Sequence, residues 1–276
     1  MIKGIKSMFK QFIAAILAVT MLTSSVFAAG KITVKGSDTM VILAQRWAEK
    51  YMNTKGDASI QVTGGGSGTG ISALINGTTD ICNSSRPMKS GEIQKLKERF
   101  GTLGVEIPCA KDGITIYVNP SNPVSDLSMD QLKDIYTGKI TNWKQVGGPD
   151  ARIVVYSREN NSGTYVFFKD HVLKGKDYTA SAQNLPGTAA VVNAVAKDKF
   201  GIGYGGAAYA KGVKECKVNG ILPTADNIKS NKYPISRYLY MYLRNKPSGD
   251  IKKYVDWILS SEGQKIVTEV GYFPAK

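Results

Sequence analysis

Histidine and cysteine are scarce in this chain of 276 residues, and their scarcity argues against several chemistries. The only histidine is His171, and there are three cysteines. No cysteines and histidines share the close spacing of a zinc site, and Ser162 has no evident base to activate it as a nucleophile. The sequence therefore predicts no metal site, no cofactor and no enzyme activity.

The cysteine count also limits disulfide bonds. The three residues are Cys82, Cys109 and Cys216, and an odd count is not a disulfide framework. We expect at most one bridge, between Cys82 and Cys109, and the alternative is that all three are buried free thiols.

Long apolar runs are missing after residue 30, so no later segment is expected to span a membrane. Before that point the chain has three lysines in its first ten residues, then the apolar stretch "FIAAILAVTML", then small residues around Ala28. This order is typical of a secretory signal peptide. We predict that residues 1–28 are removed on export to the periplasm, without a lipid anchor, because no cysteine lies near the cleavage site.

Acidic residues are outnumbered, since 36 lysines and arginines against 22 aspartates and glutamates give a formal charge of +14. Such a charge favours anionic partners, but the lysines are scattered, as on an ordinary solvated surface. There is no zinc-finger spacing and no aromatic RNA-binding signature, so no nucleic-acid partner is predicted.

Strand and helix patterns alternate along the chain. The strand "KITVKGS" is followed by apolar residues on one face of a helix from about Thr39, namely Met40, Leu43, Ala44, Trp47, Ala48 and Tyr51. Two more strand–helix units follow before residue 100, which predicts a parallel sheet covered by helices. The later pattern predicts a second α/β lobe. We expect lobe I to comprise residues 29–112 and 219–276, and lobe II residues 113–218.

Four loops that follow strands share one chemistry. They are "GSDTM" (36–40), "GGGSGTG" (64–70), "NSSRP" (83–87) and "SRENNSGT" (157–164). Each alone is an ordinary set of cap and turn residues. Three of them stand where a helix begins, and unpaired N–H groups there attract anions. "GGGSGTG" lacks the lysine of a phosphate loop and the last glycine of a dinucleotide motif, so the four loops together predict a site for a small anion.

Two arginines follow predicted strand ends. Arg158 comes directly after "RIVVYS", and its planar guanidinium suits two oxygens of an oxyanion; the alternative is a surface arginine paired with Glu159. Arg86 follows "NSS" and either lines the cleft or pairs with an acidic residue.

These loops, with "KDGITIYVNPSNP" and "LKDIYTGKITNW", occur in the order and spacing of the phosphate-binding proteins of bacterial phosphate ABC transporters, which the chain resembles over nearly its whole mature length. The resemblance implies a periplasmic-binding-protein-like α/β fold, with two lobes, a ligand cleft between them and a two-strand hinge. It also implies a monomer that delivers inorganic phosphate to an inner-membrane ABC permease. The implied ligand-binding residues are Thr39, Met40 through its amide, Ser67, Arg158, Ser162, Gly163 and Thr164, with Ser85 and Arg86 as further candidates.

Two positions depart from the pattern of many members of that family. Ser85 stands where an aspartate accepts a proton from phosphate, and Asn160 stands where an aspartate holds the arginine. Asp38 is either a substitute proton acceptor or a helix cap. Both departures make the site less negative, which leaves sulfate, molybdate and tungstate as alternative ligands, and a sensor or surface protein as an alternative role.

Overall fold

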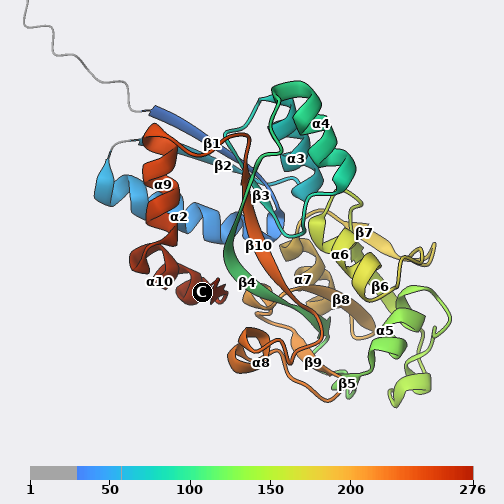
Figure 1. Cartoon of the computed structure of the whole chain (residues 1–276). Coiled ribbons are helices and arrows are strands. Elements are labelled where there is room, and N and C mark those ends of the chain that lie inside the picture. Colours follow the sequence, from blue (N-terminus) through green and yellow to red (C-terminus); the bar gives the residue numbers. More distant parts are fainter. Residues whose placement is uncertain (1–29, 57, 276) are drawn as a thin grey trace, which may run out of the picture.

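The computed structural model describes residues 30–56 and 58–275, so the predicted signal peptide lies outside the described residues. Figure 1 shows two groups of helices and strands, joined by the long strands β4 (Val105–Val118) and β10 (Ser236–Leu243). The predicted α/β fold with two lobes is confirmed. Within the described residues, no helix has the length and apolar character needed to cross a membrane.

The first lobe is built on a sheet in which β1 lies between β2 and β3. The three strands run parallel, which confirms the predicted parallel sheet. Strand β10 extends this sheet by pairing antiparallel to β3. Helices and short elements pack around this sheet. The elements of this lobe other than β4 and β10 are β1 (Gly30–Gly36), η1 (Asp38–Met40), α2 (Val41–Lys55), β2 (Ala58–Thr63), α3 (Ser67–Asn76), β3 (Ile81–Ser84), α4 (Ser90–Phe100), α9 (Gly249–Leu259), α10 (Ser261–Val270) and β11 (Phe273–Pro274).

Helices cover both faces of this sheet because its strands carry apolar side chains on both sides. Ile81 packs against α2, α9 and α10 on one face, and its neighbour Cys82 packs against α3 and α4 on the other. Met241 and Tyr242 of β10 divide between the same two cores. Aliphatic residues of this strand thus face the first core, and Tyr240 and Tyr242 face the second.

The second lobe continues from the far half of β4, which pairs antiparallel with β8 and β9. Strand β6 lies parallel to both β8 and β7. The elements of this lobe are β5 (Asp126–Leu127), α5 (Met129–Tyr136), η2 (Trp143–Val146), β6 (Val154–Arg158), α6 (Gly163–His171), β7 (Gln183–Leu185), α7 (Thr188–Lys197), β8 (Gly201–Gly206), η3 (Ala207–Tyr209), β9 (Lys214–Val218) and α8 (Ala225–Lys229).

Strands β4 and β10 link the two lobes. They pair antiparallel from Val105 opposite Leu243 to Gly113 opposite Ser236, and β4 then runs on into the second lobe. Ile228 and Ile235 pack into the core of the second lobe, although they follow residue 218. The exact lobe boundaries stay a prediction, and this packing favours a return to the first lobe near Ser236.

The expected disulfide between Cys82 and Cys109 is wrong, because all three cysteines are free and buried. Cys82 lies on β3 and Cys109 on β4, and β10 pairs with both strands from between them. Two strand spacings, about 10 Å, exceed the Cα separation that a disulfide can bridge. Burial raises the pKa of each thiol, to about 12 for Cys216, so these groups are unreactive.

Candidate functional site

The four polar loops meet between the lobes. They follow the carboxyl ends of β1, β2, β3 and β6, which is where open α/β sheets bind ligands. Thr39, Ser67 and Ser85 come from the first lobe, Arg158 and Thr164 come from the second, and all five are buried. Buried polar side chains are costly unless they are paired. The meeting of five of them between the lobes therefore indicates a site for a polar ligand.

Direct hydroxyl contacts join the loops. The Oγ1 atoms of Thr39 and Thr164, on opposite lobes, are 2.9 Å apart. Ser67 Oγ lies 3.3 Å from Ser85 Oγ and accepts a hydrogen bond from the Ser85 N–H at 3.0 Å. Two pairs of hydroxyls thus lie close together where the lobes meet.

Arg158 is the most buried of the cations described at the site, at 1% exposure. One Nη atom donates to Asp38 Oδ2 at 2.7 Å, and the other donates to Thr188 Oγ1 at 2.9 Å. Its Nε has no hydrogen-bond partner among the described residues. A buried donor without a partner is unfavourable, so this group calls for an acceptor that the protein itself does not supply.

Asp38 takes the place of the missing aspartate beside the arginine. Its Oδ2 pairs with Arg158, and its Oδ1 accepts from the Gly65 N–H at 2.7 Å. The cap of the η1 turn is Ser37 rather than Asp38. The carboxylate that holds Arg158 therefore comes from the opposite lobe, and the departure at Asn160 is compensated.

Two helices begin at the site. Helix α3 starts at Ser67 and α6 starts at Gly163, so each presents N–H groups that lack partners within the helix. Ser162 is the N-cap of α6, and its hydroxyl accepts from the Tyr165 N–H at 3.3 Å. The Met40 N–H donates to the Ser37 carbonyl at 3.0 Å, so this predicted donor already has a partner within its own loop.

Glycine is required where the loops touch. A Cβ on Gly163 would lie 2.2 Å from Ser67 Oγ and 2.6 Å from Ser85 Oγ. Gly66 has a φ of +88°, and a Cβ there would lie 2.7 Å from the Asn161 carbonyl oxygen of the other lobe. The glycines of these loops thus permit the lobes to approach within hydrogen-bond distance, as between the Gly68 N–H and the Asn161 carbonyl at 2.9 Å.

The structure places Arg86 with an acid rather than among the hydroxyls. Its two Nη atoms donate to the carboxylate of Glu92 at 2.7 and 2.8 Å. Burial acts to raise the pKa of Glu92, but hydrogen bonds from Arg86 and from the Lys89 N–H outweigh it and hold the pKa below its ordinary value. Of the two readings of Arg86, the geometry favours the ion pair, which ties the loop after β3 to helix α4.

Sequence reasoning missed Arg237, a buried arginine on β10. It pairs with Asp112 of β4 and also donates to Thr164 Oγ1 at 3.0 Å. A signal was present, because alternation along the strand places Arg237 on the same side as the aliphatic residues Leu239 and Met241. Thr188, which accepts from Arg158, follows no polar loop motif and gave no such signal.

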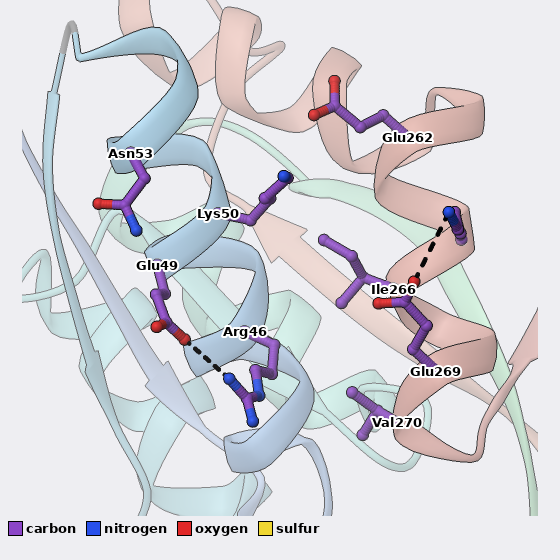
Figure 2. Close-up of a pocket in the computed structure, with 9 residues that line it drawn as sticks. Arg46, Glu49, Lys50, Asn53, Glu262, Ile266, Glu269 and Val270 are labelled. Carbon is purple, nitrogen blue, oxygen red and sulfur yellow. Dashed lines mark hydrogen bonds and ion pairs between the residues drawn. The ribbon is translucent and has the colours of Figure 1, made fainter.

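A separate groove of about 620 Å³ lies between α2 and α10, away from these residues (Figure 2). Charges of both signs line it, including the pairs Arg46–Glu49 and Lys265–Glu269. None of the predicted ligand residues contributes to it.

Two α/β lobes linked by two strands, with buried polar groups of both lobes meeting between them, form a periplasmic-binding-protein-like architecture. The family model of the PBP superfamily domain matches residues 23–262 of the chain. The phosphate-binding protein PstS of Pseudomonas aeruginosa PAO1 is 32% identical over 268 residues, which covers 89% of this chain and 83% of the relative. PstS of Bacillus subtilis 168 is 36% identical over 250 residues, covering 90% and 81%.

Solved structures agree with these relatives. A putative phosphate ABC transporter substrate-binding protein from Clostridium perfringens, with bound phosphate, superposes with a TM-score of 0.84 at 35% identity and covers 90% of this chain and 100% of its own. An ABC-type phosphate transport receptor from Vibrio cholerae gives 0.73 at 31% identity, covering 88% and 99%. The chain belongs to the PBP superfamily and, within it, to the family of PstS phosphate-binding proteins.

Proposed function

We propose that this protein captures inorganic phosphate between its lobes outside the cytoplasm and delivers it, unchanged, to an ABC permease in the membrane. The observation that carries the proposal is the meeting of the buried hydroxyls of Thr39, Ser67, Ser85 and Thr164 between the lobes, together with the buried Arg158, whose Nε has no partner among the described residues. Relatives and solved neighbours named for phosphate support the choice of ligand.

Capture follows from the position of these groups on two lobes. When the lobes separate, the Thr39–Thr164 hydrogen bond and the Asp38–Arg158 ion pair break. On closure around the anion, the hydroxyls, the Arg158 guanidinium and the first N–H groups of α3 and α6 replace its hydration shell. Charge-assisted hydrogen bonds contribute roughly 1.5–3 kcal/mol each. Several of them outweigh the dehydration cost and leave about 8 kcal/mol, which is micromolar affinity.

The proposal involves no chemical conversion. The His171 ring bonds the Pro234 carbonyl at 2.8 Å, and no thiol of the described chain is exposed.

Export rests on the signal-peptide pattern of residues 1–28. Mass determination of the N-terminus of the protein recovered from the periplasm should give a chain that begins near Ala29, whereas an intact Met1 would contradict export by cleavage.

Ser85 gives a specific reason to consider another tetrahedral oxyanion. A neutral hydroxyl in place of an aspartate does not repel sulfate, which carries no proton at neutral pH. Phosphate stays the preferred ligand because a serine oxygen can still accept one hydrogen bond from it.

Calorimetric titration with phosphate, sulfate, molybdate and tungstate at several pH values tests the proposal. The protein should first be unfolded and refolded to remove any anion carried through purification. We expect phosphate to bind with a Kd in the micromolar range or lower, and sulfate at least about 100-fold more weakly, a difference of about 2.7 kcal/mol. Tighter binding of sulfate, molybdate or tungstate than of phosphate would overturn the assignment of the ligand.

A further inference from the structure

Arg237 is a buried arginine whose side chain reaches both lobes from the strands that link them. It lies near the start of β10 and is 5% exposed. One Nη atom donates to the Ser85 carbonyl of the first lobe at 2.8 Å, and the other donates to Thr164 Oγ1 of the second lobe at 3.0 Å.

Asp112 balances the charge of this arginine. Its Oδ2 accepts from Arg237 Nε at 3.1 Å and from Nη2 at 2.8 Å, and the carboxylate is fully buried. The ring of Phe167 lies 5.5 Å from the guanidinium carbon and closes off another side. The pair adds no net charge to the site, and four hydrogen bonds occupy most of the five N–H groups that a guanidinium has.

The hydrogen bond to Thr164 fixes the direction of its hydroxyl proton. A guanidinium only donates, so Thr164 Oγ1 must accept from Arg237. The one proton of that hydroxyl then points elsewhere, and its other neighbour is Thr39 Oγ1 at 2.9 Å, on the side where the lobes meet. A hydroxyl held in this way donates to an incoming anion without a cost for reorientation.

We propose that Arg237 is a positioning residue for anion capture: it holds Thr164 as a hydrogen-bond donor to the ligand and ties it to Ser85 of the opposite lobe. This inference rests on the proposed function and assigns to the linking strands a part in the affinity of the site. Arg158 meets the anion, whereas Arg237 acts through Thr164.

A double-mutant cycle with inorganic phosphate tests this coupling by calorimetry. Arg237→Lys keeps the charge beside Asp112 but lacks the planar, spread donors that reach Asp112, the Ser85 carbonyl and Thr164, and it should weaken phosphate binding by at least about tenfold. In a Thr164→Val background, which removes the hydroxyl, the same substitution should change the Kd by less than about threefold. Thr164→Ser, which restores the hydroxyl, should restore most of the affinity and the sensitivity to Arg237→Lys.

Controls separate this role from general stability. Arg244→Lys changes a neighbouring arginine that bonds the Thr79 carbonyl and no site residue, and it should leave the Kd unchanged. If Arg237→Lys fails to fold, the pair Arg237→Met with Asp112→Leu removes the same donor without leaving a buried unpaired charge, and it should show the same loss.

Unchanged phosphate binding by Arg237→Lys would overturn this inference alone. An equal loss in the wild-type and Thr164→Val backgrounds would also overturn it, because Arg237 would then act independently of Thr164. Absence of phosphate binding by the wild-type protein would overturn the proposed function together with this inference.

Discussion

Arg158 is held on two sides before any ligand is considered, by Asp38 from the first lobe and by Thr188 from the second. An arginine fixed in this way loses little side-chain freedom when it binds an anion, so less of the interaction energy is spent on ordering it. The ion pair also spans the lobes, so the same carboxylate that orients Arg158 stabilises their approach.

Adding a single methyl group at Gly163 tests how closely the two lobes must approach each other. Gly163→Ala places a Cβ against Ser67 Oγ and Ser85 Oγ of the other lobe. Overpacking of this kind costs roughly 1–3 kcal/mol, and we expect phosphate binding to weaken by about tenfold or more. Calorimetry gives the Kd, and thermal unfolding should show a Tm close to that of the wild-type protein, since the crowding falls on the contact between the lobes.

The matched control is Gly91→Ala in helix α4. A Cβ there meets nothing within 4 Å, and the backbone has no left-handed φ. This substitution should leave phosphate binding unchanged and the Tm equal or slightly higher, because alanine favours the helix. Equal affinities of Gly163→Ala and the wild-type protein would show that Gly163 does not lie at the ligand.

Helix α4 is fastened to the loop after β3 by Arg86 and Glu92, and this contact makes stability depend on pH. Because the pKa of Glu92 is lowered in the folded protein, its contribution is present above the unfolded pKa of about 4.3 and is lost as the pH falls through the folded pKa. Glu92→Gln should lower the free energy of unfolding at pH 7 by roughly 2 kcal/mol. That corresponds to a fall in Tm of roughly 4–8 °C.

Thermal unfolding at several pH values checks this expectation. The difference in Tm between the wild-type protein and Glu92→Gln should shrink as the pH falls below the unfolded pKa and through the lowered folded pKa of Glu92, where the wild-type carboxylate becomes protonated. Glu98→Gln on the same helix, where Glu98 accepts only an exposed hydrogen bond from Gln94, should change the Tm by less than roughly 2 °C. A difference for Glu92→Gln that is constant with pH would contradict the ionic role.

Helices and strands could be predicted well because their signals are local. The apolar spacing from Met40 to Tyr51 indicates one helix face, and that face is buried in the structure. Partners distant in sequence could not be predicted in the same way. Nothing near Arg158 indicates that Asp38 would hold it, and nothing near Cys82 indicates that β10 would separate it from Cys109. The burial of Arg237 could be predicted from its place in a buried strand, but its hydrogen-bond partners could not.

The two-lobed arrangement of the molecule arises because β4 and β10 carry the chain between two α/β units (Figure 1). Each unit has its own cores, so the lobes can keep their internal packing while the polar groups between them separate and meet. The edge of a single sheet offers hydrogen-bond donors to an anion from one side only. Two lobes offer donors from opposite sides, so together they can replace the hydration shell of the anion.

The most direct test compares phosphate titrations of the wild-type protein, Arg158→Ala and Arg158→Ala with Asp38→Asn, with Arg46→Ala as control. Arg46 pairs with the exposed Glu49 in the groove between α2 and α10 (Figure 2). Loss of charge-assisted hydrogen bonds should weaken binding of both Arg158 variants by at least about 100-fold, while Arg46→Ala binds like the wild-type protein. A Kd within about threefold of wild type for the Arg158 variants would contradict the account, since the anion would then bind elsewhere.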